Sequence, residues 1–362
     1  MTSHVSGDRP PWSGRPGAGV IALLVVLLSS ILAACDLVQA DGVTASVRTG
    51  PLPTLSVVVD TDMLPDDWLA LLYLVSEPGV DIRAVTVAHG SVVGCEAGVA
   101  IARDLLAGVG ESDVPVACGP PASPGGTPFP SEWVEETRAA AAGIGWTADD
   151  GDPPGATIPT GDAVALLRAA VEDGPITIVS LGPPTNIARL FDDPTWDRSN
   201  VDRIVQMAGA VDVPGNVESL PSVEWNAVVD PAALATVLTS DIEVVLVSLD
   251  GTNHLPIRTA DIDRMTSDRS TPAAALAAQV LDTQRAFAKT GGYYMWDVLT
   301  AMTARQPDVV RVESIPVRVS LDPGEAGRTV RDPAGHETLV TVEADAEGFE
   351  RIFLEALLGR AR

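Results

Sequence analysis

The chain has 362 residues, 46% of them hydrophobic, with a formal net charge of −26 and an isoelectric point near 4.3. This length suffices for one large α/β domain or two small ones. The acidity excludes nucleic acid as a partner, because no basic surface is present to neutralise phosphates and release their counterions.

The first residues have the pattern of an exported lipoprotein. Arg9 and Arg15 precede an apolar stretch from Val20 to Ala34, which is short for a membrane span but typical of a secretory signal. The tetrapeptide at 32–35, Leu-Ala-Ala-Cys, resembles a bacterial lipobox, whose Cys becomes lipidated. An ordinary signal peptide with an unrelated Cys, or an uncleaved anchor, is the alternative.

This pattern predicts the domain organisation and the location of the protein. We expect a lipoprotein signal peptide over 1–35 that ends at Cys35, a polar tether over 36–53, and one domain over 54–362. The protein would then be held on the bacterial cell membrane by its lipid, outside the cytoplasm.

From Leu55 onward, strand-like and helix-like segments alternate along the chain. Strands are predicted at Leu55–Asp60, Ile82–Ala88, Val114–Cys118, Ile176–Leu181, Ile204–Ala208 and Ile242–Leu249. Helices are predicted at Asp67–Ser76, Gly94–Ala107, Gly161–Glu172, Thr185–Phe191, Pro231–Leu238 and Pro272–Ala288. The tail adds strands at Ile315–Leu321 and Thr338–Val342 and a helix over 346–358. The fold class is therefore α/β, with an open, mostly parallel, Rossmann-like sheet flanked by helices.

One long segment, 119–160, is rich in Gly and Pro and contains only a short helical piece at 131–142. Loops of this length in a domain are usually functional or disordered, and this one leaves the carboxyl side of the sheet. We expect a lid over a site there. Trp133 and Trp146 either line this lid or pin it to the core.

Two further cysteines fit an exported protein. Cys95 lies after the second predicted strand, and Cys118 ends the third. Because neighbouring strand tips are close in a parallel sheet, a disulfide between them is geometrically plausible in an oxidising compartment. The alternative is two buried free thiols.

Four carboxylates follow the first strand. Asp60, Asp62, Asp66 and Asp67 lie within eight residues, at the strand end where open α/β sheets bind ligands. Acids this close repel one another unless a cation or a pKa shift intervenes, and oxygen ligands favour Ca²⁺ or Mg²⁺. A helix dipole explains acids in the first helical turn, but not Asp60 and Asp62.

Several motifs in a fixed order resemble the calcium-dependent nucleoside hydrolases, the inosine-uridine preferring family. They are D-x-D-x-x-x-D-D at 60–67, G-P-P-T-N-I-A at 182–188, M-A-G-A-V at 207–211, E-x-N-x-x-x-D-P at 224–231 and Trp296-Asp297, all expected at or near strand tips. The resemblance extends from about Leu55 to Leu358. It implies an N-ribohydrolase that splits ribonucleosides into base and ribose with a Ca²⁺-activated water.

The resemblance also implies a metal site. The carboxylates of Asp62, Asp67 and Asp297 would ligate Ca²⁺ together with the backbone carbonyl of Leu181. Asp62 would also be the general base that takes a proton from the attacking water. Asp60 would orient the strand tip without touching the ion.

The substrate residues follow from the same resemblance. Asp66 would accept hydrogen bonds from the ribose hydroxyls, and Asn216, Glu224 and Asn226 would hold the sugar. The transition state of N-glycosidic cleavage resembles an oxocarbenium ion, which nearby carboxylates and amide oxygens stabilise.

The chain departs from the family pattern at two places. The family often has T-V-A-G-N after the second strand, whereas residues 86–91 read Thr-Val-Ala-His-Gly-Ser, so His89 or Ser91 would replace the missing Asn. Many members have His-Asp where this chain has Trp296-Asp297, and indole cannot supply a proton to the leaving base. Trp296 would instead stack on the base or pack beside the metal. Because a purine can leave after protonation by solvent or another group, the change favours purine nucleosides. Tyr293 and Tyr294 are alternative proton donors or lid contacts.

Two other functions would use parts of the same pattern. A lipoprotein that binds nucleosides or sugars on the same fold with little or no turnover would explain both departures. A phosphotransferase of the haloacid-dehalogenase type would use the Asp60-x-Asp62 pair, but Met63-Leu64-Pro65 does not fit the Gly-Thr it needs. The sequence leaves open which base is accepted and whether the chain forms a homo-oligomer.

Overall fold

The computed structural model describes residues 53–88, 92–122, 125–146 and 163–360. The predictions for Cys35, His89 and Ser91, and for the signal peptide and tether up to residue 52, lie outside these residues.

Nine strands of the described chain form one sheet, in the order β3-β2-β1-β4-β5-β6-β9-β7-β8. The first six strands and β9 pair in parallel, and β7 runs antiparallel to β8 and β9. The bounds are β1 Leu55–Thr61, β2 Val80–Val87, β3 Val116–Cys118, β4 Ile176–Ser180, β5 Val201–Met207, β6 Val244–Val247, β7 Val310–Val319, β8 Thr329–Arg331 and β9 His336–Ala344. The predicted mostly parallel sheet is confirmed.

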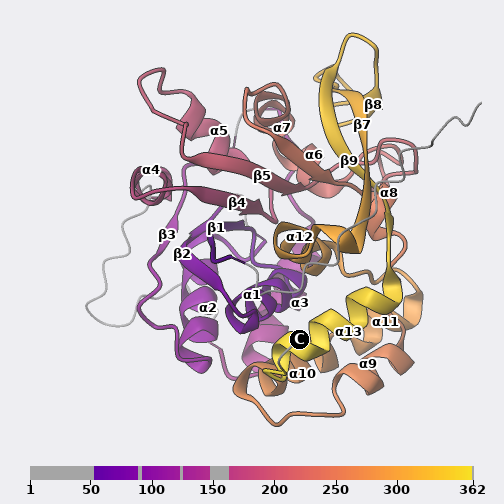
Figure 1. Cartoon of the computed structure of the whole chain (residues 1–362). Coiled ribbons are helices and arrows are strands. Elements are labelled where there is room, and N and C mark those ends of the chain that lie inside the picture. The colour runs from indigo at the N-terminus through magenta and orange to yellow at the C-terminus, as the bar shows by residue number, and fades with distance from the viewer. Residues whose placement is uncertain (1–52, 89–91, 123–124, 147–162, 361–362) are drawn as a thin grey trace, which may run out of the picture. The chain divides into compact units, whose positions relative to one another are not determined.

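Helices cover both faces of this sheet. Val57 and Val59 of β1 pack into one hydrophobic core and Val58 into the other, as the alternation of a strand covered on both sides requires. The first core includes α1 Pro65–Ser76, α2 Cys95–Gly108, α10 Pro272–Thr283, α12 Trp296–Arg305 and α13 Ala346–Leu357. The second includes α4 Ala163–Glu172, α5 Thr185–Phe191 and α7 Pro231–Leu238. Figure 1 shows the two layers of helices on opposite sides of the strands.

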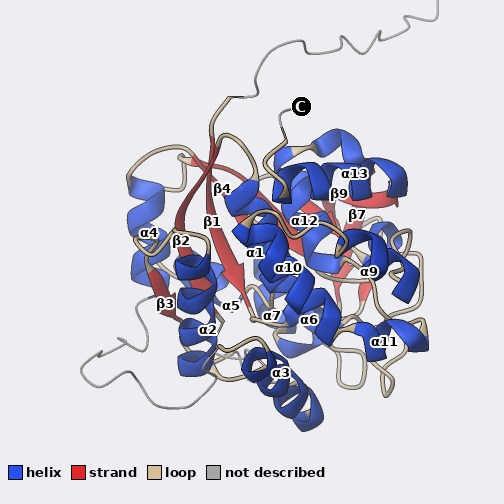
Figure 2. Cartoon of the chain, turned by 90° about the horizontal axis from the view of Figure 1, so that it is seen from below, coloured by secondary structure: helices blue, strands red, loops and turns tan. Residues whose placement is uncertain are grey.

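The described chain has further helical segments in addition to these. They are α3 Ser131–Gly143, α6 Trp225–Val229, α8 Leu249–Thr252, α9 Thr259–Met265, α11 Arg285–Thr290 and the 3₁₀ turn Pro307–Val309. In Figure 2, α3 lies beyond the carboxyl end of β1, where the sequence predicts a lid.

The structure corrects three sequence predictions. The single helix predicted over Pro272–Ala288 is two helices that meet at Gln284. A short strand, β8, lies in the segment predicted as turns. Helix α12 was not predicted, because Val298, Thr300 and Thr303 are residues that favour strands. Its two Thr hydroxyls donate to Trp296 O and Leu299 O one turn back, which lets the helix accommodate them.

The two tryptophans of the predicted lid have different roles. Trp146 is buried and packs edge-on against Trp68 of α1, with ring centroids 5.1 Å apart, so it pins the chain just after α3 to the core. Trp133, near the start of α3, faces the cavity described below. No helix of the described chain has the length and hydropathy that a membrane crossing requires.

Cys95 and Cys118 form a disulfide in the structure, with Cα atoms 5.5 Å apart. It joins the first residue of α2 to the last residue of β3. The bridge therefore ties Cys118, the residue just before the predicted lid, to the start of α2.

Removing this bridge is expected to destabilise the domain. Replacing Cys118 by Ala frees a loop with a sequence separation of 23 in the unfolded chain, and loops of this size lose about 2–4 kcal/mol of stability without their cross-link. Thermal unfolding of Cys118→Ala, and of the unchanged protein with and without reductant, measures the loss. Unfolding that is the same in all three samples would contradict the bridge.

Candidate active site

The turn after β1 is wound around the carboxylate of Asp67. Its Oδ1 accepts from the Thr61 hydroxyl and from the Asp62 N–H at 3.3 Å, and its Oδ2 accepts from the Leu64 N–H at 2.9 Å. Asp67 lies in the first turn of α1, where the helix dipole favours a negative charge. One carboxylate thus shapes the whole turn that carries Asp62.

Met63 sits at the centre of this turn with φ +63°, the one non-glycine residue of the described chain with a positive φ. This left-handed conformation is uncommon for a side chain of this size and is held by its surroundings. The Met63 N–H donates to the Thr61 hydroxyl at 3.0 Å, and the Trp68 indole donates to the Met63 carbonyl at 3.1 Å. The strained residue turns the chain so that Asp62 lines the cavity.

Four carboxylates meet at this point. Oxygens of Asp66, Asp67 and Asp297 lie within 4.8 Å of one another, and all three residues are buried. Asp62 adjoins Asp67, and its Oδ1 finds no hydrogen-bond partner among the described residues. The three acids within 4.8 Å of one another therefore include two predicted metal ligands, Asp67 and Asp297, and also Asp66, which was predicted to bind the ribose. The third predicted carboxylate ligand, Asp62, lies beside them.

Burial and mutual repulsion raise the pKa of these acids. Burial, and then the charge of Asp67, raise the pKa of Asp66 to about 8. Burial, followed by the charges of neighbouring acids, raises the pKa of Asp62 and of Asp297 well above the ordinary range. Burial also raises the pKa of Asp67, against the hydrogen bonds that it accepts.

The residues present fit a hard divalent cation. Buried carboxylate oxygens, one of them without a partner, adjoin one another, and the described lining of the cavity includes no Lys, Arg or His that would neutralise them. Leu181 lines the same cavity. Its carbonyl, the predicted backbone ligand, accepts a hydrogen bond from the Asn226 amide at 2.6 Å. Oxygen donors of this kind are the ligands that Ca²⁺ prefers.

Asp60 lies behind the cluster. Its Oδ1 accepts from the Thr86 hydroxyl at 2.6 Å and from the Asn186 amide at 2.7 Å. Burial raises its pKa to about 7, although both hydrogen bonds favour the charged form. Asp60 is fully buried and does not line the cavity, so it ties β1, β2 and α5 together at the strand tips.

Gly182 allows β4 and the turn after β1 to approach closely. A Cβ at this position would lie 2.8 Å from the Asp62 nitrogen and 2.9 Å from its Cβ. Any side chain there would displace Asp62. The glycine of the G-P-P-T-N-I-A segment is therefore required by packing against the acid cluster.

The three residues predicted to hold a sugar line the cavity, but in different ways. Both oxygens of Glu224 accept from backbone N–H groups, those of Gly209, Asn226 and Ala227, so this carboxylate chiefly fixes the start of α6. The Asn226 amide donates to Leu181 O and Met207 O. The Asn216 Oδ1 accepts from the Trp225 N–H at 3.1 Å. Asn216 and Asn226 keep polar atoms for a ligand.

Two of the predicted site segments do not follow strands. Asp297 lies in the first turn of α12, and Glu224 caps α6. Both nevertheless lie near strand tips, as expected, because Glu224 accepts from the Gly209 N–H just after β5 and Asp297 adjoins the acids that follow β1. Helix α12 packs against α1, so the two acidic helix starts, with Asp66 and Asp67 on α1, lie side by side.

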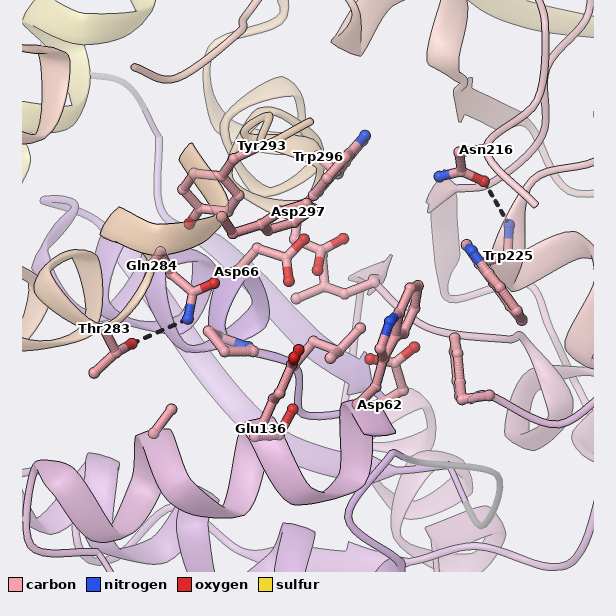
Figure 3. Close-up of a pocket in the computed structure, with 18 of the residues that line it drawn as sticks. Asp62, Asp66, Glu136, Asn216, Trp225, Thr283, Gln284, Tyr293, Trp296 and Asp297 are labelled. Carbon is pink, nitrogen blue, oxygen red and sulfur yellow. Dashed lines mark hydrogen bonds between the residues drawn. The ribbon is translucent and has the colours of Figure 1, made fainter. Parts of the chain in front are cut away.

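The acids open into a cavity of about 740 Å³. Figure 3 shows Asp66 and Asp297 near its centre, Asn216 and Trp225 on one side, and Thr283 and Gln284 on the other. One wall is an aromatic cluster of Phe129, Trp133 and Trp225, with Trp133 and Trp225 centroids 4.9 Å apart. The opposite wall includes Phe287, Tyr293 and Trp296.

Several lining residues were not predicted from the sequence. They are Phe129 and Glu136 from the predicted lid, Trp225 from the E-x-N motif, and Gln284 and Phe287 from the break between α10 and α11. Trp225 was detectable, because it lies between two predicted residues. Tyr293 and Tyr294 were the alternative proton donors that the sequence offered. Of the two, Tyr293 lines the cavity and Tyr294 does not.

Comparison with known proteins agrees with this geometry. A family model described as inosine-uridine preferring nucleoside hydrolase matches residues 57–351. A pyrimidine-specific ribonucleoside hydrolase of Salmonella paratyphi C is 32% identical over 233 residues, 63% of this chain and 70% of that protein. The chain belongs to the inosine-uridine preferring nucleoside hydrolase family. The predicted enzyme class is thereby confirmed.

Solved structures share the fold. An inosine-uridine preferring nucleoside hydrolase from Bacillus anthracis superposes with a TM-score of 0.72 at 23% identity, covering 84% of this chain and 100% of that one. A plant nucleoside hydrolase gives a TM-score of 0.71 at 26% identity, covering 84% and 99%. A purine-preferring ribonucleoside hydrolase from Gardnerella vaginalis gives 0.68 at 23% identity, with the same coverage.

The acid cluster predicts how stability depends on pH and on calcium. The pKa of Asp66 rises from its ordinary 3.8 to about 8 on folding, so the folded protein binds more protons than the unfolded chain. Without a cation, the free energy of unfolding therefore falls as pH rises through this window. Ca²⁺ bound at the cluster would replace the protons, so its addition is expected to reverse the fall.

Thermal unfolding at about pH 5 and about pH 8, with chelator and with Ca²⁺, measures this effect. We expect the stabilisation by Ca²⁺ to be larger at the higher pH. A Tm in chelator that stays level or rises with pH would contradict the prediction.

Proposed function

We propose that the protein hydrolyses the N-glycosidic bond of ribonucleosides to give free base and ribose. The observation that carries the proposal is the position of Asp62. It lines the cavity at the tip of β1 with one carboxylate oxygen unpartnered, beside three further acids and between two aromatic walls.

Each group has a role in this reaction. Asp62 takes a proton from the attacking water at a carboxylate oxygen, which contributes about 10²–10⁴-fold. Asp66 accepts hydrogen bonds from the ribose hydroxyls, while Asn216 and Asn226 orient the sugar. As the bond to the base breaks, positive charge develops at the anomeric carbon, and the surrounding carboxylates stabilise it.

Asp62, Asp67, Asp297 and the Leu181 carbonyl would hold a calcium ion. When bound there, Ca²⁺ supplies a lower pKa for the attacking water and a fixed geometry for the ribose hydroxyls. Support for this ligand set comes from the buried, uncompensated oxygens in the cavity.

We also propose that the protein is exported and held at the membrane by a lipid on Cys35. The signal-like sequence over 1–35 supports this proposal. The tether would join the domain at the amino end of β1, the opposite end of that strand from the acids.

Ribose release from inosine, adenosine, guanosine, uridine and cytidine tests the reaction. We expect release that chelation suppresses and that Asp62→Asn lowers by about 10²-fold or more, because the general base is lost. Asp113→Asn, which changes an exposed acid outside the cavity, is the matched control and should keep full activity.

The same experiment separates the enzyme from a binding protein. Release that is unaffected by Asp62→Asn would remove Asp62 as the base. No release from any nucleoside, with Ca²⁺ shown to be bound, would contradict the hydrolase and favour a protein that only binds nucleosides.

A further inference from the structure

The cavity is strongly anionic, and its acids extend beyond the cluster at the tip of β1. Its lining carries five carboxylates, those of Asp62, Asp66, Glu136, Glu224 and Asp297. The described lining includes no Lys, Arg, His or Cys. A bound divalent ion offsets part of the charge of the aspartates, but Glu136 lies outside that group.

Glu136 faces the cavity from the helix that covers it. Trp133, Glu136, Thr137 and Ala140 share one face of α3 and line the cavity, at the spacing of one side of a helix. Figure 3 shows Glu136 rising from α3 toward the acids. It forms no ion pair with any described residue. Glu136 and the adjacent Glu135 are both exposed, but only Glu136 lines the cavity.

The two aromatic walls complement this charge. Phe129, Trp133 and Trp225 contact one another with centroids 4.9 to 5.9 Å apart, and Phe287 and Trp296 line the other side. Aromatic faces attract a cation within about 6 Å, most strongly where water is excluded. A flat ligand between these walls is therefore favoured if it carries positive charge.

The chemistry of the leaving base points the same way. A neutral base departs with an electron pair and needs a proton, yet Trp296 cannot supply one. The Tyr293 hydroxyl is buried and has no hydrogen-bond partner among the described residues. A base with a fixed positive charge leaves as a neutral molecule and needs no proton.

We propose that this cavity accepts N-ribosides whose base carries a fixed positive charge, such as an N-ribosylated pyridinium, and that Glu136 is the residue that selects them. The proposal rests on the N-glycosidic hydrolysis proposed above. Water attacks the anomeric carbon and loses a proton to Asp62. The bond from carbon to the ring nitrogen breaks, and its electron pair neutralises the ring, so the products are ribose, a neutral pyridine and one proton.

Nicotinamide riboside and inosine are the substrates that test this selectivity. We expect a higher kcat/KM for nicotinamide riboside, measured against the rates of both compounds without enzyme. Glu136→Gln should lower kcat/KM for nicotinamide riboside by about tenfold and leave inosine nearly unchanged, because only the cation loses an attractive charge. Glu135→Gln on the same helix should change neither.

Binding of two small bases gives a readout that is independent of turnover. 1-Methylnicotinamide is a stable cation, and nicotinamide is its neutral counterpart. Calorimetry of the purified protein with Ca²⁺ should show the cation binding about tenfold more tightly, a preference that Glu136→Gln reduces and Glu135→Gln keeps.

Three results would overturn the proposal: equal affinity for the two bases, no cleavage of nicotinamide riboside by a protein that cleaves inosine, or a Glu136→Gln variant that loses both activities equally. If no riboside is cleaved but the cation still binds more tightly through Glu136, the selectivity stands and the proposed hydrolysis fails.

Discussion

The mutual repulsion of four buried carboxylates is the constraint on which the rest of the site depends. Asp62, Asp66, Asp67 and Asp297 are withdrawn from water and adjoin one another, an arrangement that is unfavourable unless positive charge is supplied. Asp67 is compensated within the protein by the hydrogen bonds that it accepts from the turn. Asp62, with an unpartnered oxygen, is not. The fold thus holds an unsatisfied negative site in place, which a bound cation would complete.

The scaffold around this site is built from three packed elements, because Asp62 follows β1, Asp66 and Asp67 lie on α1, and Asp297 lies on α12. Thr61 and Met63 hold the turn after β1, Asn186 and Thr86 hold Asp60 beneath it, and Gly182 admits the neighbouring strand tip. Asp297, the fourth acid, lies on α12, whose buried face packs in the same core as α1. Preorganisation of this kind lets charges act on a substrate without rearranging during the reaction.

The sequence was sufficient to predict the sheet and the first acids. The strand at 55–61 and the acids that follow are local features, in which a β-branched run is followed by an acidic turn and an apolar helix. Helix α12 was missed, because its Thr and Val residues favour strands and only its packing stabilises it as a helix. The hydrogen bonds that Glu224 accepts from backbone N–H groups were not predicted either, because no sequence pattern shows them.

The part of the cavity formed by α3 and by the break between α10 and α11 was the hardest to predict from the sequence. Glu136 and Gln284 belong to segments whose direction depends on tertiary packing. Glu136 lies on α3, and Trp146, just after this helix, packs against Trp68. Gln284 lies at the break between α10 and α11. Their local sequences contain no motif. Some of the residues that line the cavity thus lie on the elements that are hardest to place from sequence.

A crystal structure of the protein grown with Ca²⁺ and ribose tests the central claim most directly. The account predicts an anomalous calcium peak bounded by carboxylate oxygens of Asp62, Asp67 and Asp297 and by the Leu181 carbonyl, with ribose hydroxyls completing its coordination. A calcium peak elsewhere, or no peak at the cluster at saturating Ca²⁺, would contradict the claim that this acid cluster is a metal site.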